Sequence, residues 1–238
     1  MSNWRRKKYD APGLSQAPPG PYLAAVARRW TRKIYVTSPG WDNIGEVLKS
    51  MGVAFEPFTG GYDCDLLFVN CGTKDRLDQA RLQRFVYAGG CLYASDLTSG
   101  LIAAAFPGMF QFGGSGQAGK VVANIVDDEL RQIVGKSIKI HFDMGSWAIL
   151  QGCQGEILVE AAKSTAYGGR PLMVEVEFGE GAVFYTSFHN RAQLSKQEKV
   201  LLQLMVLKQI STASNTTVTQ TSRSLGISLT GLKLNADR

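Results

Sequence analysis

Asp96 and His189 lie far apart in the sequence but together have the side-chain types that acid–base chemistry uses. An imidazole can transfer a proton near neutral pH, and a carboxylate beside it can orient it or hold its charge. Such a pair needs a hydroxyl or a water to activate, and Ser95, Thr98 and Ser187 are hydroxyls close to one or the other in the sequence. The candidate catalytic residues are therefore Asp96, His189 and Ser95.

Each of the chain's two histidines also has a structural interpretation. His189 can be a hydrogen-bonded residue of a strand-to-helix turn, with no part in catalysis. His141 lies in the alternating run KIHFD, which is typical of a satisfied strand histidine. Trp147, a few residues further on in FDMGSW, fits packing in the core or an interface.

The cysteines give no sign of a metal centre. Cys64, Cys71, Cys91 and Cys153 have no CxxC spacing, and only two histidines could join them. Zinc sites are usually recognised from such paired ligands. We therefore expect no metal and no cofactor, and with no export signal we expect reduced thiols in a cytoplasmic protein.

Alternating strands and helices would have to position the candidate residues. The expected order is strand, helix, strand, strand, helix, strand, at residues 33–38, 42–51, 53–57, 65–70, 75–88 and 91–94. This alternation predicts an α/β fold with a mostly parallel sheet flanked by helices, a flavodoxin-like three-layer sandwich. Ligands in such sheets lie beyond the carboxyl ends of the strands. We expect a crevice there, lined by Gly40, Cys71, Gly72, Ser95, Asp96, His189 and Asn190.

The second half of the chain predicts a β-rich excursion from this pattern. Strands are expected at 120–126, 137–142, within 149–160, at 173–178 and at 182–187, with helices at 127–134 and 195–210. Gly114–Lys120, GSGQAGK, matches the GxxxxGK part of a phosphate-binding loop. Val121 stands where Ser or Thr would hold Mg²⁺, and VVANIV reads as a strand. We expect a flexible glycine loop over the crevice.

Charge separates the N-terminal arm from the rest of the chain. Residues 1–33 carry eight Lys/Arg and one acid (+7), and the remainder carries 18 Lys/Arg and 19 Asp/Glu (−1), for the net +6. Arg5, Arg6, Lys7 and Lys8 could bind nucleic acid or an acidic partner, or form a solvated tail. No apolar run reaches the roughly 18 residues of a membrane span.

These patterns predict three parts. Residues 1–20 form a flexible basic arm, residues 21–210 an α/β domain, and residues 211–238 a Ser/Thr-rich tail. Within the tail, 211–224 reads as a linker and 225–234 as a segment that docks on a partner or on the domain itself.

The order of elements resembles the class I glutamine amidotransferase-like fold, in its divergent branch near the ThuA-like proteins. The resemblance covers roughly residues 33–210 and rests on DLLFVNCG, GGCLYASD and GEGAVFYTSFHN. In active members of that family a Gly-x-Cys-x-Gly elbow supplies a thiolate nucleophile. A downstream His, followed two residues later by Glu, activates it.

This chain departs from the family pattern at the residues that react. The elbow tip aligns as Asp96, or as Ser95 if the register slips by one, and both flanking glycines are absent. Arg191 stands two residues after His189 in place of the Glu. Cys71 follows the strand that usually leads into the oxyanion loop, so it can enter the crevice but not as the elbow nucleophile. We expect that glutamine hydrolysis by the family mechanism is lost.

Three functions fit these observations. The first is a non-catalytic amidotransferase-like binding or scaffold subunit of a larger assembly, with a protein partner or a second copy of the chain. The second is a small-molecule hydrolase that uses Asp96 and His189. The third is a nucleic-acid-associated protein that binds through its basic arm.

Overall fold

The computed structural model describes residues 32–232. The basic residues Arg5, Arg6, Lys7 and Lys8 and the start of the predicted α/β domain, residues 21–31, lie outside this range. Residues 32–232 belong to one compact unit. None of the described helices combines the length and the apolar character needed to cross a membrane.

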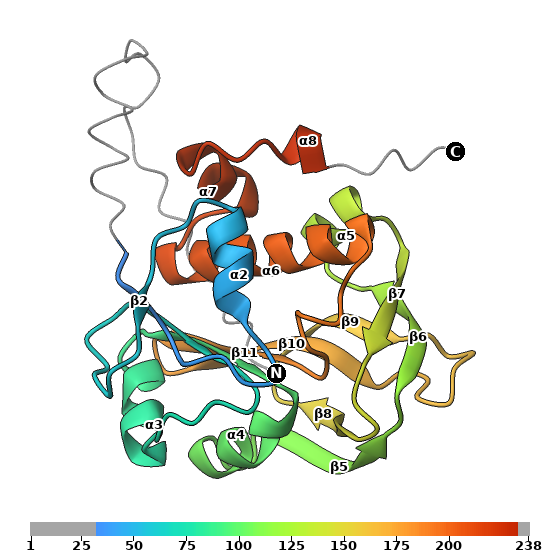
Figure 1. The fold of residues 1–238 in the computed structure, drawn as a ribbon, viewed down its shortest axis with the longest axis horizontal. Helices are drawn as coiled ribbons and strands as arrows, with labels where there is room; N and C mark the ends of the chain where they lie inside the picture. The colour runs from blue at the N-terminus through green and yellow to red at the C-terminus, as the bar shows by residue number, and fades with distance from the viewer. Residues whose placement is uncertain (1–31, 233–238) are drawn as a thin grey trace, which may run out of the picture. The chain divides into compact units, whose positions relative to one another are not determined.

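A mixed sheet forms the centre of the described region (Figure 1). Its strands, in spatial order, are β2 (Glu56–Pro57), β1 (Ile34–Val36), β3 (Leu66–Val69), β4 (Cys91–Ser95), β11 (Gly181–Thr186), β10 (Pro171–Phe178), β9 (Glu156–Ala161), β6 (Gly119–Ile125) and β7 (Ser137–Phe142). The strands from β2 to β11 run parallel. Those from β10 to β7 continue the sheet antiparallel.

Helices cover both faces of this sheet (Figure 1). On one face lie α2 (Ile44–Ser50), α5 (Asp128–Val134), α6 (Lys196–Ser214) and α7 (Val218–Ser224), and on the other lie α3 (Gln79–Tyr87) and α4 (Ser99–Ala105). The short helices η1 (Asp96–Thr98) and α8 (Leu229–Leu232) complete the helical set of the described region. The predicted three-layer α/β class, with its mostly parallel half and β-rich excursion, is confirmed.

The strands of the parallel half have continuously apolar sequences because they are buried on both faces of the sheet. All four residues of β3 and all five of β4 are buried, because helices cover the sheet on both sides. Helix α3, in the range predicted as a helix, adds Leu82, Phe85 and Val86 to the core, and these form one apolar face of the helix. It begins later than the predicted residue 75, because the Asp78 carboxylate accepts a hydrogen bond from the Arg81 N–H and caps it there.

The flexible glycine loop predicted at Gly114–Lys120 is wrong. Gly116 is the last residue of β5 (Phe110–Gly116), which pairs with β8 (Trp147–Cys153), and Gly119 begins β6. A side chain at Gly116 would overlap the indole of Trp147, so this glycine serves close packing. Trp147 is buried, stacks on Phe142 at 4.1 Å between ring centroids, and has the core role that its surroundings suggested.

The linker predicted at 211–224 is also wrong. Helix α6 begins after a Ser195–Glu198 capping box, close to the predicted start at residue 195, but continues through Ser214, and α7 follows. The Ser211 hydroxyl donates to the Thr221 Oγ1 at 2.7 Å, so the two helices are joined by a buried hydrogen bond. Ser and Thr are abundant here because their hydroxyls fill this contact and the helix caps, not because the segment is unstructured.

Candidate functional site

The loops that follow β1 and β3 pack against each other at the carboxyl edge of the sheet. A side chain at Gly40 would overlap the Gly72 backbone, and one at Gly72 would overlap the ring of Trp41. Gly72 also has φ +74°, which favours glycine. The Trp41 N–H donates to the Cys71 carbonyl oxygen at 2.9 Å. These predicted crevice residues therefore fix the backbone of the site.

Asp96 lies at the elbow tip, directly after β4. Its φ of +41° is in the left-handed region, which a residue other than glycine rarely adopts. Two hydrogen bonds hold it: the Tyr185 hydroxyl donates to the Asp96 carbonyl oxygen at 2.7 Å, and the Ala148 N–H donates to Oδ1 at 2.8 Å. Asp96 is only 1% exposed. The strained residue of the elbow is thus Asp96, and Ser95 precedes it in extended backbone.

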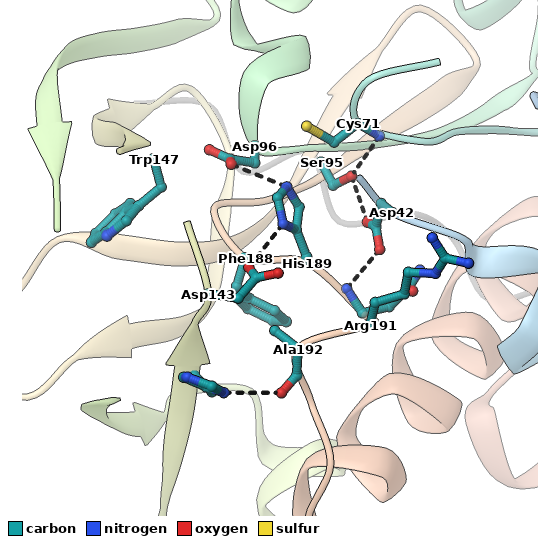
Figure 2. A network of polar contacts seen from close by, with 12 residues as sticks. Asp42, Cys71, Ser95, Asp96, Asp143, Trp147, Phe188, His189, Arg191 and Ala192 are labelled. Atoms are coloured by element: carbon teal, nitrogen blue, oxygen red, sulfur yellow. Dashed lines mark hydrogen bonds and ion pairs between the residues drawn. The ribbon is translucent and has the colours of Figure 1, made fainter. Parts of the chain in front are cut away.

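His189 follows β11 and lies between two carboxylates (Figure 2). Its Nε2 is 3.2 Å from Asp96 Oδ2, and its Nδ1 is 3.0 Å from Asp143 Oδ1. The imidazole is buried, whereas the Asp143 side chain is 40% exposed. The structure therefore brings the predicted pair Asp96 and His189 together and adds a third residue, Asp143.

The sequence does not reveal Asp143 as a partner of His189. The family pattern places the orienting carboxylate two residues after the histidine, where this chain has Arg191. The guanidinium of Arg191 instead pairs with Glu46 at 3.3 Å. Asp143 comes from the connection between β7 and β8, inside the excursion. An acidic residue directly after the strand KIHF was the only available signal.

The surroundings of His189 change its protonation. Burial lowers the pKa of the imidazole, but contacts with Asp96 and Cys71 and the charge of Asp42 outweigh burial and raise the pKa to about 11. The ring therefore keeps its proton through the neutral range. A general base must start unprotonated, so His189 in this arrangement is poorly suited to that role.

A second network surrounds the buried carboxylate of Asp42. The Ser95 hydroxyl donates to Asp42 Oδ2 at 2.8 Å, and the Asn190 N–H donates to Oδ1 at 2.8 Å. The Cys71 N–H in turn donates to Ser95 Oγ at 3.3 Å. Burial raises the pKa of Asp42, although the Ser95 hydrogen bond opposes this. Asp42 therefore ties together the ends of β1, β3, β4 and β11.

In the sequence, Asp42 stands only where it could cap the helix expected at 42–51. The N-cap of α2 is Asn43, which makes no side-chain capping bond. Ser95, a candidate nucleophile, is held by Asp42 rather than by His189. Among the other hydroxyls, Thr98 donates to the Ser95 carbonyl oxygen at 2.9 Å. His141 lies in β7 with Nδ1 3.3 Å from the Ala192 carbonyl oxygen, as expected of a satisfied strand histidine.

Cys71, Asp96 and His189 form a compact cluster of chemically different side chains. The Cys71 sulfur, one Asp96 carboxylate oxygen and one His189 ring nitrogen lie within 4.8 Å of one another, and all three residues are buried. Figure 2 shows their side chains converging from three strand ends. The cysteine spacing could not reveal this cluster, because each member follows a different strand.

Two grooves flank the buried residues. One of about 340 Å³ is lined by Trp41, Val69, Gly72, Thr73, Asp75, Leu77, Leu97, Thr98 and Leu101. Another of about 410 Å³ is lined by Glu46, Val47, Ser50, Asn190, Arg191, Gln193, Leu194, Lys199, Leu202 and Gln203. Gly72 and Asn190 are thus the members of the predicted crevice that line these two grooves.

Comparison with known proteins supports the fold. No protein-family model and no curated protein matches the sequence. A protein described as part of a GMP synthase from Thermoplasma acidophilum matches over 77% of this chain and 94% of its own, with a TM-score of 0.54 and 13% identity. PurLQS from Thermotoga maritima matches over 74% of this chain and 99% of the chain compared, with a TM-score of 0.51 and 13% identity.

A larger enzyme contains a similar part. The β-galactosidase from Bacillus circulans matches over 78% of this chain but only 31% of its own length, with a TM-score of 0.51 and 14% identity. At such identities these likenesses concern the fold alone. The chain therefore has a class I glutamine amidotransferase-like fold, as its sequence predicted, and its placement near the ThuA-like branch stays a prediction.

Proposed function

We propose that this chain is a non-catalytic amidotransferase-like binding or scaffold subunit of a larger assembly. The observation that carries the proposal is Asp96, which occupies the strained elbow tip where active members of the fold have a cysteine. Its Oδ1 accepts the Ala148 N–H, and its Oδ2 faces His189. A carboxylate that is 1% exposed, with both oxygens in contact, is held as a structural ion pair rather than as a free nucleophile.

Exposed apolar side chains beside the site support a binding role. Trp41 is 61% exposed and Leu97 is 49% exposed, and both line the groove at the ends of β1 and β4. Large apolar residues grouped on a surface mark contact sites, and Trp is among the residues that contribute most at them. The partner is a protein or a second copy of the chain.

One comparison also supports this proposal. The similar protein from Thermoplasma acidophilum is described as one component of a synthase, so the same fold occurs as one part of an assembly.

We also propose a reducing compartment such as the cytoplasm. Four cysteines support it, because all of them are free: Cys64, Cys71, Cys91 and Cys153.

The assembly proposal is tested by measuring complex formation at the groove. Purified full-length chain is examined by light scattering for self-association and by quantitative affinity capture for a defined partner. Trp41→Ala should weaken the complex at least tenfold. Tyr87→Ala is the matched control, because Tyr87 is 64% exposed but lies at the end of α3 beside the β10–β11 turn. A chain that stays monomeric and captures no stoichiometric partner would refute the proposal.

A second candidate function rests on Asp143. Asp96, His189 and Asp143 lie in the spatial order of a hydrolase triad, in which His189 would have to release its proton before it could act as the base. The test is turnover of esters, amides and sugar derivatives by the native chain and by Asp143→Asn, whose site of substitution is partly exposed. A triad requires that Asp143→Asn lowers turnover at least tenfold. Equal rates in the two chains exclude it.

The nucleic-acid hypothesis concerns the arm that carries Arg5, Arg6, Lys7 and Lys8, outside the described residues, and stays a prediction. Binding through these residues should weaken steeply as salt increases, because phosphate contacts release counterions. Binding that is independent of salt would contradict it.

A further inference from the structure

We infer that Cys71, Asp96 and His189 form a binding site for a divalent metal ion of the zinc type, which links the carboxyl ends of β3, β4 and β11. The three side chains present sulfur, oxygen and nitrogen donors within 4.8 Å of one another in a buried position. The inference is independent of the proposed function, because a bound ion can stabilise a scaffold as well as an enzyme.

The separation of the donors fits a common metal. Zn–N bonds of about 2.0–2.1 Å and Zn–O bonds of about 2.0–2.2 Å at a tetrahedral angle place the two ligand atoms about 3.3–3.5 Å apart. His189 Nε2 and Asp96 Oδ2 are 3.2 Å apart. The Cys71 sulfur, within 4.8 Å of both, needs to move by at most on the order of 1 Å to complete three vertices of the tetrahedron.

The orientation of the His189 imidazole is a second observation that supports a metal site. His189 is 2% exposed, and its Nε2 has no hydrogen-bond partner among the described residues. The Asp96 oxygen is close enough for an ion pair but does not lie where an N–H would point. A buried ring nitrogen without an aligned partner costs free energy unless something else binds it. A metal ion placed between these donors provides that partner.

The three ligand residues are themselves held by hydrogen-bonding groups, as the ligands in metal sites usually are. Asp143 contacts His189 Nδ1 at 3.0 Å, and such a carboxylate fixes the tautomer and directs Nε2 toward a metal. The Ala148 N–H holds the other oxygen of Asp96 at 2.8 Å. The Cys71 carbonyl oxygen accepts the Trp41 N–H, which fixes the cysteine backbone. The donor atoms of Asp96 and His189 and the backbone of Cys71 are therefore positioned before any ion binds.

The donor set selects the kind of ion. A thiolate and an imidazole suit borderline-soft ions such as Zn²⁺ and disfavour Ca²⁺ and Mg²⁺, which prefer oxygen ligands. Binding requires that the Cys71 thiol and the His189 imidazolium each release one proton. The ion then offsets the charges of the thiolate and the Asp96 carboxylate, so the site stays neutral overall. Three protein ligands leave a fourth position for water or a small ligand.

Spectroscopy with Co²⁺ as the probe tests this inference on the full-length native chain. One equivalent of Co²⁺ should give the intense visible absorption of a tetrahedral ion and a near-ultraviolet band from thiolate to metal. Zn²⁺ should displace the probe at a ratio of one ion per chain. A native chain that shows no thiolate band and retains no zinc after dialysis overturns the inference.

The variants assign the ligands. Cys71→Ser should abolish the thiolate band, and His189→Gln should lower zinc affinity at least a hundredfold. Cys64→Ser is the matched control, since Cys64 is only partly buried and lies outside the cluster, and it should leave the spectrum unchanged. Circular dichroism checks that each variant is folded. A thiolate band that survives Cys71→Ser or disappears with Cys64→Ser refutes the assignment, even if other variants fail to fold.

Discussion

Asp42 holds several strand ends together through a single buried carboxylate. It accepts hydrogen bonds from the Ser95 hydroxyl and from the N–H groups of Asn43 and Asn190. Asp42→Ala would leave these donors buried without a partner, so we expect the free energy of unfolding to fall by about 3 kcal/mol. Asp42→Asn keeps the shape and one acceptor oxygen, and should cost about 1 kcal/mol.

Urea denaturation of the two variants at neutral pH tests this order. The difference between the two losses in unfolding free energy is the informative quantity, because both variants remove the same negative charge and differ only in the hydrogen bonds that they keep. Equal losses for Ala and Asn would mean that the charge of Asp42, rather than its hydrogen bonds, stabilises the strand ends.

Glu175, on β10, makes stability depend on pH. Burial raises its pKa to about 7, helped by Glu156 and Glu177, while the Thr212 hydrogen bond and the charge of Lys208 oppose this. The folded state therefore binds the proton more tightly than the unfolded state. The resulting stabilisation is fully present below the unfolded value of 4.5 and is lost as the pH rises to about 7.

Glu175→Gln removes this dependence. We expect the variant to be about 1–3 kcal/mol more stable than the native chain at pH 8, with the difference vanishing below pH 5. Denaturation curves at both pH values measure it. The same stability difference at pH 5 and pH 8 would show that Glu175 does not titrate in this range.

The residues of the site differ in how readily the sequence reveals them. Asp96 and His189 follow strands that are plainly apolar, so their meeting at one edge of a parallel sheet could be expected. Asp42 and Asp143 give no comparable signal, because one resembles a helix cap and the other lies in the excursion. Nothing in their spacing shows which strand end their carboxylates would reach.

The C-terminal helices belong to the domain, contrary to the composition of their sequence. Val218, Thr221 and Ser222 of α7 are buried, and Ser211 bonds to Thr221. We expect that ending the chain at residue 210 lowers Tm by about 5–15 °C, because this removes buried surface and the last turn of α6.

Calorimetry of the shortened chain measures this effect. A chain that ends at residue 228 keeps α7 and serves as the control, with Tm close to that of the full-length chain. If the cut at residue 210 leaves Tm unchanged, α7 does not contribute to the stability of the domain. Loss of partner binding in that shorter chain would then be attributable to the removed segment itself.

Helices and strands could be predicted from the sequence where a single local signal, such as an apolar run or a helix cap, was strong. The fully buried strands β3 and β4, the apolar stripe of α3 and the capping box of α6 all follow from local sequence. Strand β5 did not, since its last glycine fits against the indole of Trp147, a contact distant in sequence. Helix α7 did not either, since its hydroxyls satisfy one another only after the helices pack.

At the scale of the whole molecule, the order of strands and helices predicts the sheet and the edge where a site would lie. It does not predict the chemistry of that edge. The excursion supplies both Asp143 and the Ala148 N–H, so it closes over the elbow and completes the buried pair of Asp96 and His189. The fold is shared with a class of enzymes. In our proposal, the elbow tip that carries their nucleophile is occupied by Asp96, which makes a structural contact with His189 instead of reacting.

The rate of hydrolysis by the native chain tests the central claim, that this elbow is not catalytic. L-Glutamine and a panel of esters and amides are incubated with the purified full-length chain and with His189→Gln. If the elbow is not catalytic, the two chains and a blank without protein release ammonia, alcohol or amine at the same rate. Turnover by the native chain above the blank, lowered at least tenfold by His189→Gln, would contradict it.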